Sequence, residues 1–291
     1  MIFEGSCTAL VTPFNKDGSV NYVSIKNLLD FQIKSGTKAI LILGTTGESP
    51  TITEEERNKI IKFCSCVINK KIPLIVGCGT NCTQTSITHC KQAEKLGADG
   101  ALLVTPYYNK SNQIGLYKHF KKIANNCNLP LILYNIPSRT GINLEINTIL
   151  KLARIKNIVG IKEASGNINL ASELLQKMPE NFYLYSGDDS LTYPLMLLGA
   201  KGVISVTANC YPTEVSLLCD YCKKYDLFNA KLMHNYLYKI NKALFLDINP
   251  TCIKHYLNLK GFCVGKPRAP LFLPEAKIKR KLLEIFNHYE N

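Results

Sequence analysis

A lysine ends an apolar run in the segment NIVGIKEASG, residues 157–166, where Ile158, Val159 and Ile161 lead directly into Lys162. Burying a charged ammonium group is costly, so such a lysine either snorkels to solvent or has its charged form disfavoured. Desolvation lowers the pKa of a lysine, and the neutral amine attacks carbonyl carbons to form a Schiff base. A protonated imine is an electron sink, so Lys162 is a candidate nucleophile for carbon–carbon bond chemistry.

A tyrosine and an arginine lie close together in the segment YNIPSRTG, residues 134–141. The phenol of Tyr134 could relay protons to and from an imine, and the guanidinium of Arg139 could hold a carboxylate through two hydrogen bonds. Each residue also has a simpler explanation, as a core tyrosine with a hydrogen-bonded hydroxyl and as a surface arginine.

The segment GTTGE, residues 44–48, is a third candidate. Its two glycines permit a tight turn, and Thr45 and Thr46 offer hydroxyl and backbone N–H groups to a small anion. Taken alone, a Gly-Thr-Thr-Gly turn is a weak signal.

These segments follow apolar or β-branched runs that predict short strands. Each run precedes a segment with the apolar spacing of a helix, and Thr53 with Glu56 forms a capping-box pattern at the best-marked helix start. Short, continuously apolar strands are typical of parallel sheets covered on both faces. The strands are predicted at residues 7–11, 39–43, 73–77, 100–104, 131–134, 158–161, 182–186 and 202–206.

Eight strand–helix units favour an α/β fold, a (β/α)8 TIM barrel over residues 1–226, rather than a doubly wound sheet. Residues 227–291 read as further helices, and we expect a C-terminal helical appendage packed on the barrel. Active sites of such barrels lie at the carboxyl ends of the strands. The candidate residues all follow strands, so we expect them to meet at that end.

Composition argues against several functional classes. The net charge of +13 comes mainly from lysines on polar helix faces, and no nucleic-acid-binding motif accompanies them. The sequence predicts no membrane span and no signal peptide, so we expect a cytoplasmic protein. The twelve cysteines lack disulfide-framework spacing, and the pair Cys219 and Cys222 is expected to pack in a helix. We expect surface or hydrogen-bonded positions, and no metal, for the histidines His89, His119, His234, His255 and His288.

The motifs together resemble a known family. The segments AILILGTTGESPTITEEE, TPYYN, YNIPSRTGINL and IVGIKEASG, in this order, make the sequence similar to the dihydrodipicolinate synthase/N-acetylneuraminate lyase family of class I aldolases. The resemblance runs from the first strand to about Asn209 and continues more weakly to the C-terminus. Arg139 and the paired threonines of residues 44–48 resemble the synthases of the family rather than the lyases.

The resemblance implies a condensation of pyruvate with L-aspartate 4-semialdehyde in the diaminopimelate/lysine pathway, without a metal or organic cofactor. Lys162 would form the imine with pyruvate, Tyr134 would donate and accept the proton, and Thr45 would link Tyr134 to Tyr108. It also implies a homotetramer, a dimer of dimers, in which Tyr108 enters the site of the neighbouring subunit. Four further residues would contact the substrates: Thr46, Arg139, Ile204 and Gly187.

The resemblance also implies a regulatory region at the dimer interface, where lysine-inhibited members bind lysine. Thr85 stands where those members carry a glutamate for the α-amino group, and Glu54 and Arg57 replace histidines. A cation that loses its carboxylate partner is poorly held, so we expect weak or absent inhibition by lysine. The possible contacts in this region are Ser49, Asn81 and Tyr107.

Three alternatives stay open. The protein could be another pyruvate-dependent aldolase of the family, acting on N-acetylneuraminate or a sugar acid, although Arg139 argues against this. It could be a barrel that has lost catalysis and serves in binding, although Lys162, Tyr134, Thr45 and Tyr108 are all present. A nucleic-acid-binding role rests on charge alone.

Overall fold

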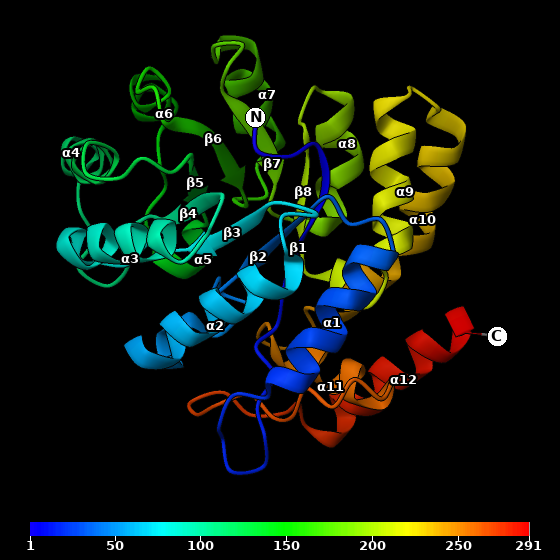
Figure 1. Ribbon diagram of the computed structural model, residues 1–291. Coiled ribbons are helices and arrows are strands. Elements are labelled where there is room, and N and C mark those ends of the chain that lie inside the picture. Colours follow the sequence, from blue (N-terminus) through cyan, green and yellow to red (C-terminus); the bar gives the residue numbers. More distant parts are fainter. Residues whose placement is uncertain (291) are drawn as a thin grey trace.

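The computed structural model describes residues 1–290, with side chains to Asn287, so Asn291 and the side chain of His288 lie outside it. Eight parallel strands close into a barrel in chain order, and β8 pairs back onto β1 (Figure 1). The predicted (β/α)8 barrel is confirmed. The strands are β1 Gly5–Ala9, β2 Ala39–Ile42, β3 Leu74–Gly77, β4 Gly100–Val104, β5 Leu131–Asn135, β6 Ile158–Glu163, β7 Tyr183–Ser186 and β8 Gly202–Ser205.

Two strands extend further at their carboxyl ends than apolar patterning indicated. β6 continues to Glu163, so Lys162 is a strand residue, and β5 continues to Asn135. The pattern ended these strands early because Lys162, Glu163 and Asn135 are polar, yet all three are buried. The two added segments pair with each other, and this pairing places Tyr134 directly opposite Lys162.

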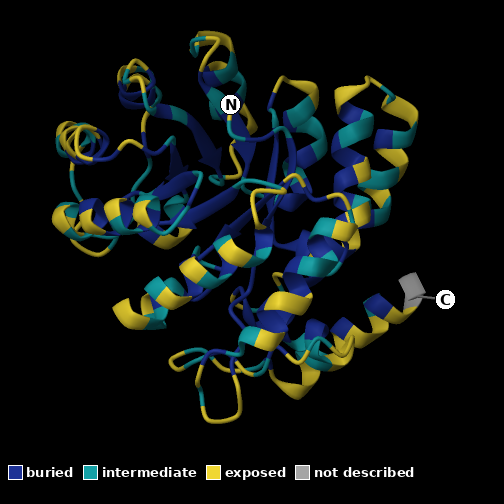
Figure 2. Cartoon of the chain, viewed as in Figure 1, coloured by how far each residue is buried: buried dark blue, intermediate teal, exposed yellow. Residues whose placement is uncertain are grey.

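The core consists of two apolar clusters, one between the strands and the outer helices and one inside the barrel. The inner cluster includes Leu41, Ile75 and Ile132 from three different strands. In Figure 2 the strands are mostly dark blue, and the surrounding helices carry buried and exposed stripes. The barrel interior is therefore packed, which leaves room for chemistry only at its ends.

Helices follow the strands and surround the barrel (Figure 1). Apolar spacing in the sequence indicates helix starts at Ile87 and Leu116, whereas these helices begin at Thr83 and Gln113, because a polar first turn carries no apolar spacing. The predicted capping box is present, with reciprocal hydrogen bonds between Thr53 and Glu56. Cys219 and Cys222 are buried in α9, as expected. The α-helices are α1 Tyr22–Lys34, α2 Glu54–Ile68, α3 Thr83–Lys95, α4 Gln113–Ala124, α5 Pro137–Thr140, α6 Ile146–Leu152, α7 Ile168–Lys177, α8 Thr192–Leu197, α9 Pro212–Lys223, α10 Leu227–Ala243, α11 Thr251–Leu259 and α12 Ala276–Glu290.

Three short 3-10 turns complete the secondary structure: η1 Ser49–Thr51, η2 Asp189–Leu191 and η3 Thr207–Asn209. The C-terminal helices follow the barrel without a break, and α10 packs along α9 while α12 contacts α10 and α11. Within residues 1–290 no helix combines the length and the apolar character needed to cross a membrane.

Candidate active site

Lys162 and Tyr134 are brought together by the pairing of β5 with β6. Lys162 is only 5% exposed, so it stays in the barrel and does not snorkel to solvent. Its Nζ lies 4.5 Å from the centre of the Tyr134 ring, which is equally buried. An amine and a phenol held this close in an apolar interior can exchange a proton with one bound molecule.

Two further residues predicted to contact the substrate lie in β8 and directly after β7. Ile204 in β8 belongs to the inner apolar cluster and is 1% exposed. Gly187 follows β7, and a Cβ atom built on it would lie 3.0 Å from Cγ and Cε of Lys162 and 2.7 Å from Cβ of Ala164. A glycine is therefore required at position 187 for the observed placement of Lys162.

The two threonines of residues 44–48 occupy a turn whose ends are in the left-handed region, with φ of 55° at both Leu43 and Glu48. Thr46 is buried, and its Oγ1 accepts a 2.9 Å hydrogen bond from Nδ2 of Asn249. Thr45 is half-buried and lines the same cavity as Tyr134. The turn thus borders the same cavity as Tyr134, the residue against which Lys162 packs.

Arg139 is exposed at the rim, in the four-residue helix α5, and its Nη2 donates a 3.2 Å hydrogen bond to the backbone oxygen of Asn249. Asn249 therefore touches both Thr46 and Arg139, although it lies far along the chain in the segment between α10 and α11. Sequence reasoning missed this residue, because no apolar pattern or motif marks it.

A cavity of about 510 Å³ opens over these residues. Lys162 does not line it directly but lies against the ring of Tyr134, which does. The lining combines apolar walls with a few polar groups, as expected for a small-molecule site. Predicted site residues in the lining are Thr45, Ser49, Tyr107, Tyr134 and Arg139, with Glu54 and Arg57 from the expected regulatory region.

Tyr108 is not brought into this cavity by the single chain. It is 93% exposed and its backbone has a φ of 68°, in the left-handed region where non-glycine residues are uncommon. Its neighbour Tyr107 is half-buried and lines the cavity. The backbone oxygen of Asn81 accepts a 2.9 Å hydrogen bond from Asn109 Nδ2, which ties this loop to the loop after β3.

The expected regulatory region holds a buried arginine and an ion pair. Arg57 is 3% exposed and donates from Nη2 to the backbone oxygen of Gly77 at 2.7 Å. Glu54 Oε1 lies 2.6 Å from Nε2 of His89. Burial and the nearby guanidinium of Arg57 lower the pKa of His89. His89 was expected at the surface or hydrogen-bonded, and it is buried with Nε2 hydrogen-bonded to Glu54, while Nδ1 has no hydrogen-bond partner.

Two adjacent carboxylates near the rim have structural roles. Asp189 is buried and accepts hydrogen bonds from the Ser205 hydroxyl and from the backbone N–H groups of Val206 and Thr207. Burial raises its pKa. Asp188 caps the turn η2 through Ser190. Within residues 1–290 no group of three or more histidine, cysteine or acidic side chains is arranged to hold a metal ion.

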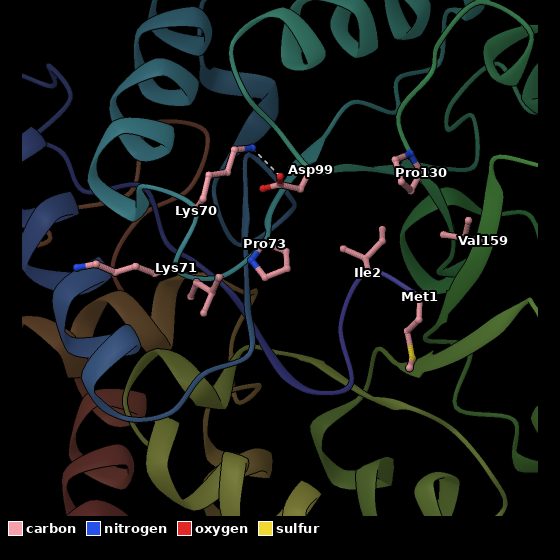
Figure 3. Close-up of a pocket in the computed structure, with 9 residues that line it drawn as sticks. Met1, Ile2, Lys70, Lys71, Pro73, Asp99, Pro130 and Val159 are labelled. Atoms are coloured by element: carbon pink, nitrogen blue, oxygen red, sulfur yellow. Dashed lines mark hydrogen bonds and ion pairs between the residues drawn. The ribbon is translucent and has the colours of Figure 1, made fainter.

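A second cavity, of about 310 Å³, lies where strands begin rather than where they end. Figure 3 shows Pro73, Pro130 and Val159 around it, together with the ion pair between Lys70 and Asp99 at 2.7 Å. None of the predicted site residues lines it. The candidate site is therefore confined to the carboxyl end of the barrel.

Comparison with known proteins agrees with this geometry. The model of the dihydrodipicolinate synthetase family matches residues 2–289. A 4-hydroxy-tetrahydrodipicolinate synthase of Clostridium novyi (strain NT) is 46% identical over 98% of this chain and 97% of its own. The crystal structure of dihydrodipicolinate synthase from Aquifex aeolicus superposes with a TM-score of 0.97 at 44% identity, covering 99% of this chain and 98% of that one.

A further solved structure, the chloride-inhibited dihydrodipicolinate synthase from Acinetobacter baumannii complexed with pyruvate, has a TM-score of 0.94 at 43% identity, with 98% of each chain covered. These matches extend over the barrel and the C-terminal helices alike. With its barrel, its buried lysine–tyrosine pair and these full-length similarities, the chain belongs to the dihydrodipicolinate synthetase family.

Proposed function

We propose that the protein condenses pyruvate with L-aspartate 4-semialdehyde to 4-hydroxy-tetrahydrodipicolinate, a lyase reaction of the diaminopimelate/lysine pathway. The observation that carries the proposal is the buried Lys162 held against the ring of Tyr134 at the carboxyl end of the barrel, in a chain of this family. A buried amine beside a proton carrier is the arrangement that Schiff-base chemistry requires.

In the proposed reaction the amine of Lys162 attacks the ketone of pyruvate, and loss of water gives the imine. Removal of a methyl proton gives an enamine, whose carbon attacks the aldehyde of the second substrate. The amino group of that substrate then attacks the imine carbon, closes the ring and releases Lys162. Tyr134 carries protons through these steps. No metal or organic cofactor takes part in the proposed mechanism.

The other residues take supporting parts in this proposal. Thr46, Ile204 and Gly187 surround the pyruvate, and Arg139 holds the carboxylate of the semialdehyde. Thr45 passes protons between Tyr134 and a tyrosine that completes the relay.

Tyr108 supplies that tyrosine from a second copy of the chain, in a dimer within a homotetramer. Its exposure in the single chain supports this assignment, because an exposed aromatic side chain on a rim loop is free to enter a neighbouring site. The reaction requires no membrane and no nucleic acid, and we place the enzyme in the cytoplasm.

We also propose that lysine is not a strong feedback inhibitor. Arg57 is a buried cation in the expected regulatory region, and Glu54 is engaged by His89. Thr85 offers no carboxylate for the α-amino group of a lysine ligand. Initial rates at millimolar lysine are expected to match those without it, and strong inhibition of the pure enzyme would contradict the proposal. Ser49, Asn81 and Tyr107 would then be the first contacts to test.

Borohydride trapping tests the imine. The protein is incubated with pyruvate and sodium borohydride, and the intact mass and a peptide map are recorded. The expected result is one reduced pyruvate adduct on Lys162 that is absent from Lys162→Ala. A folded wild-type protein that forms no adduct would exclude Schiff-base chemistry and favour a binding role for the barrel. If the adduct forms, turnover with a panel of aldehydes distinguishes aspartate semialdehyde from the sugar-acid substrates of related aldolases.

A further inference from the structure

Three residues of the C-terminal segment reach back to the turn that carries the two threonines. Asn249 donates to Thr46, as described above. Nζ of Lys254, in α11, lies 2.6 Å from Oε1 of Glu48. The backbone N–H of Arg268 donates to Oε2 of Glu48 at 2.8 Å. Both carboxylate oxygens of Glu48 are thus held by residues more than two hundred positions away.

The ion pair between Glu48 and Lys254 is fully buried, with side-chain exposure of 0% on both residues. The ammonium group also lies 4.1 Å from the centre of the Phe14 ring. Burial lowers the pKa of Lys254 to about 8, although Glu48 opposes the shift. The desolvation of two charges offsets their attraction, so such a pair is a poor source of stability. The presence of this ion pair therefore points to a role in fixing the position of the turn of residues 44–48 relative to α11.

The turn itself needs external support. Its first and last flanking residues, Leu43 and Glu48, are both in the left-handed region. A Cβ atom on Gly47 would lie 2.9 Å from the backbone nitrogen of Leu43. A backbone held in sparsely populated conformations persists only when its surroundings over-determine it. Here the surroundings include the C-terminal segment together with Thr12, whose hydroxyl donates to the backbone oxygen of Gly47 at 2.7 Å.

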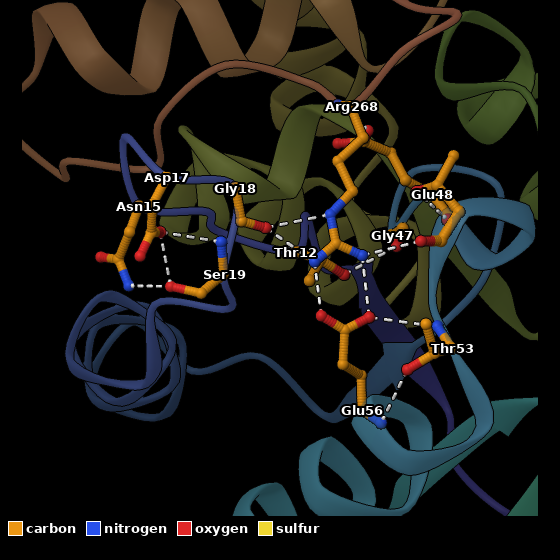
Figure 4. Close-up of polar contacts among 11 residues, drawn as sticks. Thr12, Asn15, Asp17, Gly18, Ser19, Gly47, Glu48, Thr53, Glu56 and Arg268 are labelled. Carbon is orange, nitrogen blue, oxygen red and sulfur yellow. Dashed lines mark hydrogen bonds and ion pairs between the residues drawn. The ribbon is translucent and has the colours of Figure 1, made fainter.

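Arg268 anchors that segment to the barrel rim, as Figure 4 shows. Its guanidinium forms a two-pronged ion pair with Glu56 of α2 and also donates to the backbone oxygens of Thr51 and Gly18. The residue that donates its N–H to Glu48 is therefore fixed at its side chain as well. The clamp, defined as Glu48, Lys254 and Arg268, joins the turn to both α2 and α11.

We propose that Glu48 and Lys254 are positioning residues, through which the C-terminal segment sets Thr45 and Thr46 over the reactive lysine. This inference rests on the proposed function, since it assigns the threonines to pyruvate binding and proton relay. According to this proposal the C-terminal helices affect catalysis, although they lie far from Lys162 in the sequence.

The test compares Glu48→Gln, Lys254→Met and the double variant carrying both changes. Glu48→Gln leaves the buried ammonium of Lys254 without its counter-charge, and Lys254→Met leaves the buried carboxylate of Glu48 without its counter-charge. We therefore expect each single variant to have a lower denaturation midpoint than the wild type. The double variant removes both charges at similar volume, and we expect its midpoint to recover toward wild type. Because the turn loses its side-chain link to α11, the kcat/KM of the double variant for pyruvate is expected to stay reduced on the order of 10- to 100-fold.

The matched control is Lys26→Met, which breaks an exposed ion pair with Asp30 and should change neither measurement. A stable double variant with wild-type kcat and KM for pyruvate would overturn the proposal and leave the pair a structural feature only. Borohydride trapping on the wild type is run alongside. Failure of that reaction would overturn the proposed function itself, whereas normal trapping with an unaffected double variant would overturn the clamp alone.

Discussion

A single methyl group at position 187 should displace Lys162. Gly187 lies beside β6, and a Cβ atom there would lie 2.7 Å from Cβ of Ala164 and 3.0 Å from Cγ and Cε of Lys162. The contact with Ala164 is closer than real Cβ atoms approach, and that atom is fixed to the backbone. In Gly187→Ala the new methyl therefore pushes into both neighbours, and the flexible lysine chain yields most easily.

The size of the effect follows from packing and from geometry. Overpacking of this kind costs about 1–3 kcal/mol of folding stability. The 3.0 Å contacts require the lysine chain to move by a few tenths of an ångström, and a full misplacement of about 1 Å costs on the order of 100-fold in rate. We therefore expect Gly187→Ala to fold with reduced stability and to form the trapped pyruvate adduct on the order of 10-fold more slowly.

The adduct rate is measured by quenching the borohydride reaction at intervals and recording intact mass. The control is the double variant Gly187→Ala with Ala164→Gly, which removes the closer of the two contacts. Its stability should recover, while its adduct rate stays low because the lysine is still displaced. If Gly187→Ala traps pyruvate at the wild-type rate, the glycine does not set the position of Lys162 and the reasoning fails.

Arg139→Gln is expected to raise the KM for aspartate semialdehyde on the order of 10- to 100-fold while leaving pyruvate trapping unchanged, because it removes the two-pronged carboxylate contact proposed for Arg139. Steady-state kinetics with each substrate varied in turn measures both KM values, and an equal rise in the KM for pyruvate would contradict the proposed role. Arg268 holds the pKa of Glu56 near 2, below its ordinary 4.5, so the folded protein binds fewer protons than the unfolded chain between these values. The stability from this pair is present above pH 4.5 and is lost as the pH falls to 2. Urea denaturation across this range should therefore show that Arg268→Met loses less unfolding free energy on acidification than the wild type. An identical loss in both proteins would argue against this role of the ion pair. Hydrogen bonds from Thr85 lower the pKa of the exposed Cys82, so brief treatment with iodoacetamide at neutral pH should label Cys82 first, as peptide mass mapping can check.

Much of the fold could be predicted because its pattern is local. Each strand is a short apolar run between turn residues, and eight such runs separated by helical spacing leave few architectures open. The differences between the predicted and observed helices have local causes as well. α3 begins at Thr83, although apolar spacing indicated Ile87, because its first turn is polar. The helix α5, which carries Arg139, has only four residues and is too short to show a helical period.

Residues that act over long sequence distances could not be predicted in this way. Asn249 and Lys254 touch the turn of residues 44–48 across more than two hundred positions, and nothing in their own neighbourhood indicates a partner. Glu48 belonged to a recognised motif, yet its role depends on a cation supplied by α11. Contacts of this kind exist only once the barrel has closed and the C-terminal helices have packed.

The sequence by itself determined which candidate groups follow the strands of the barrel. A lysine at the end of an apolar strand, a tyrosine in the preceding strand and an arginine after it are fixed by local pattern and by strand order. The tertiary structure decided how these groups are placed relative to one another. Strand register set Lys162 against Tyr134, and Gly187 left space for the lysine chain. Tyr108 stayed outside the site of its own chain, because the direction of a loop side chain depends on backbone torsions and on packing between distant segments.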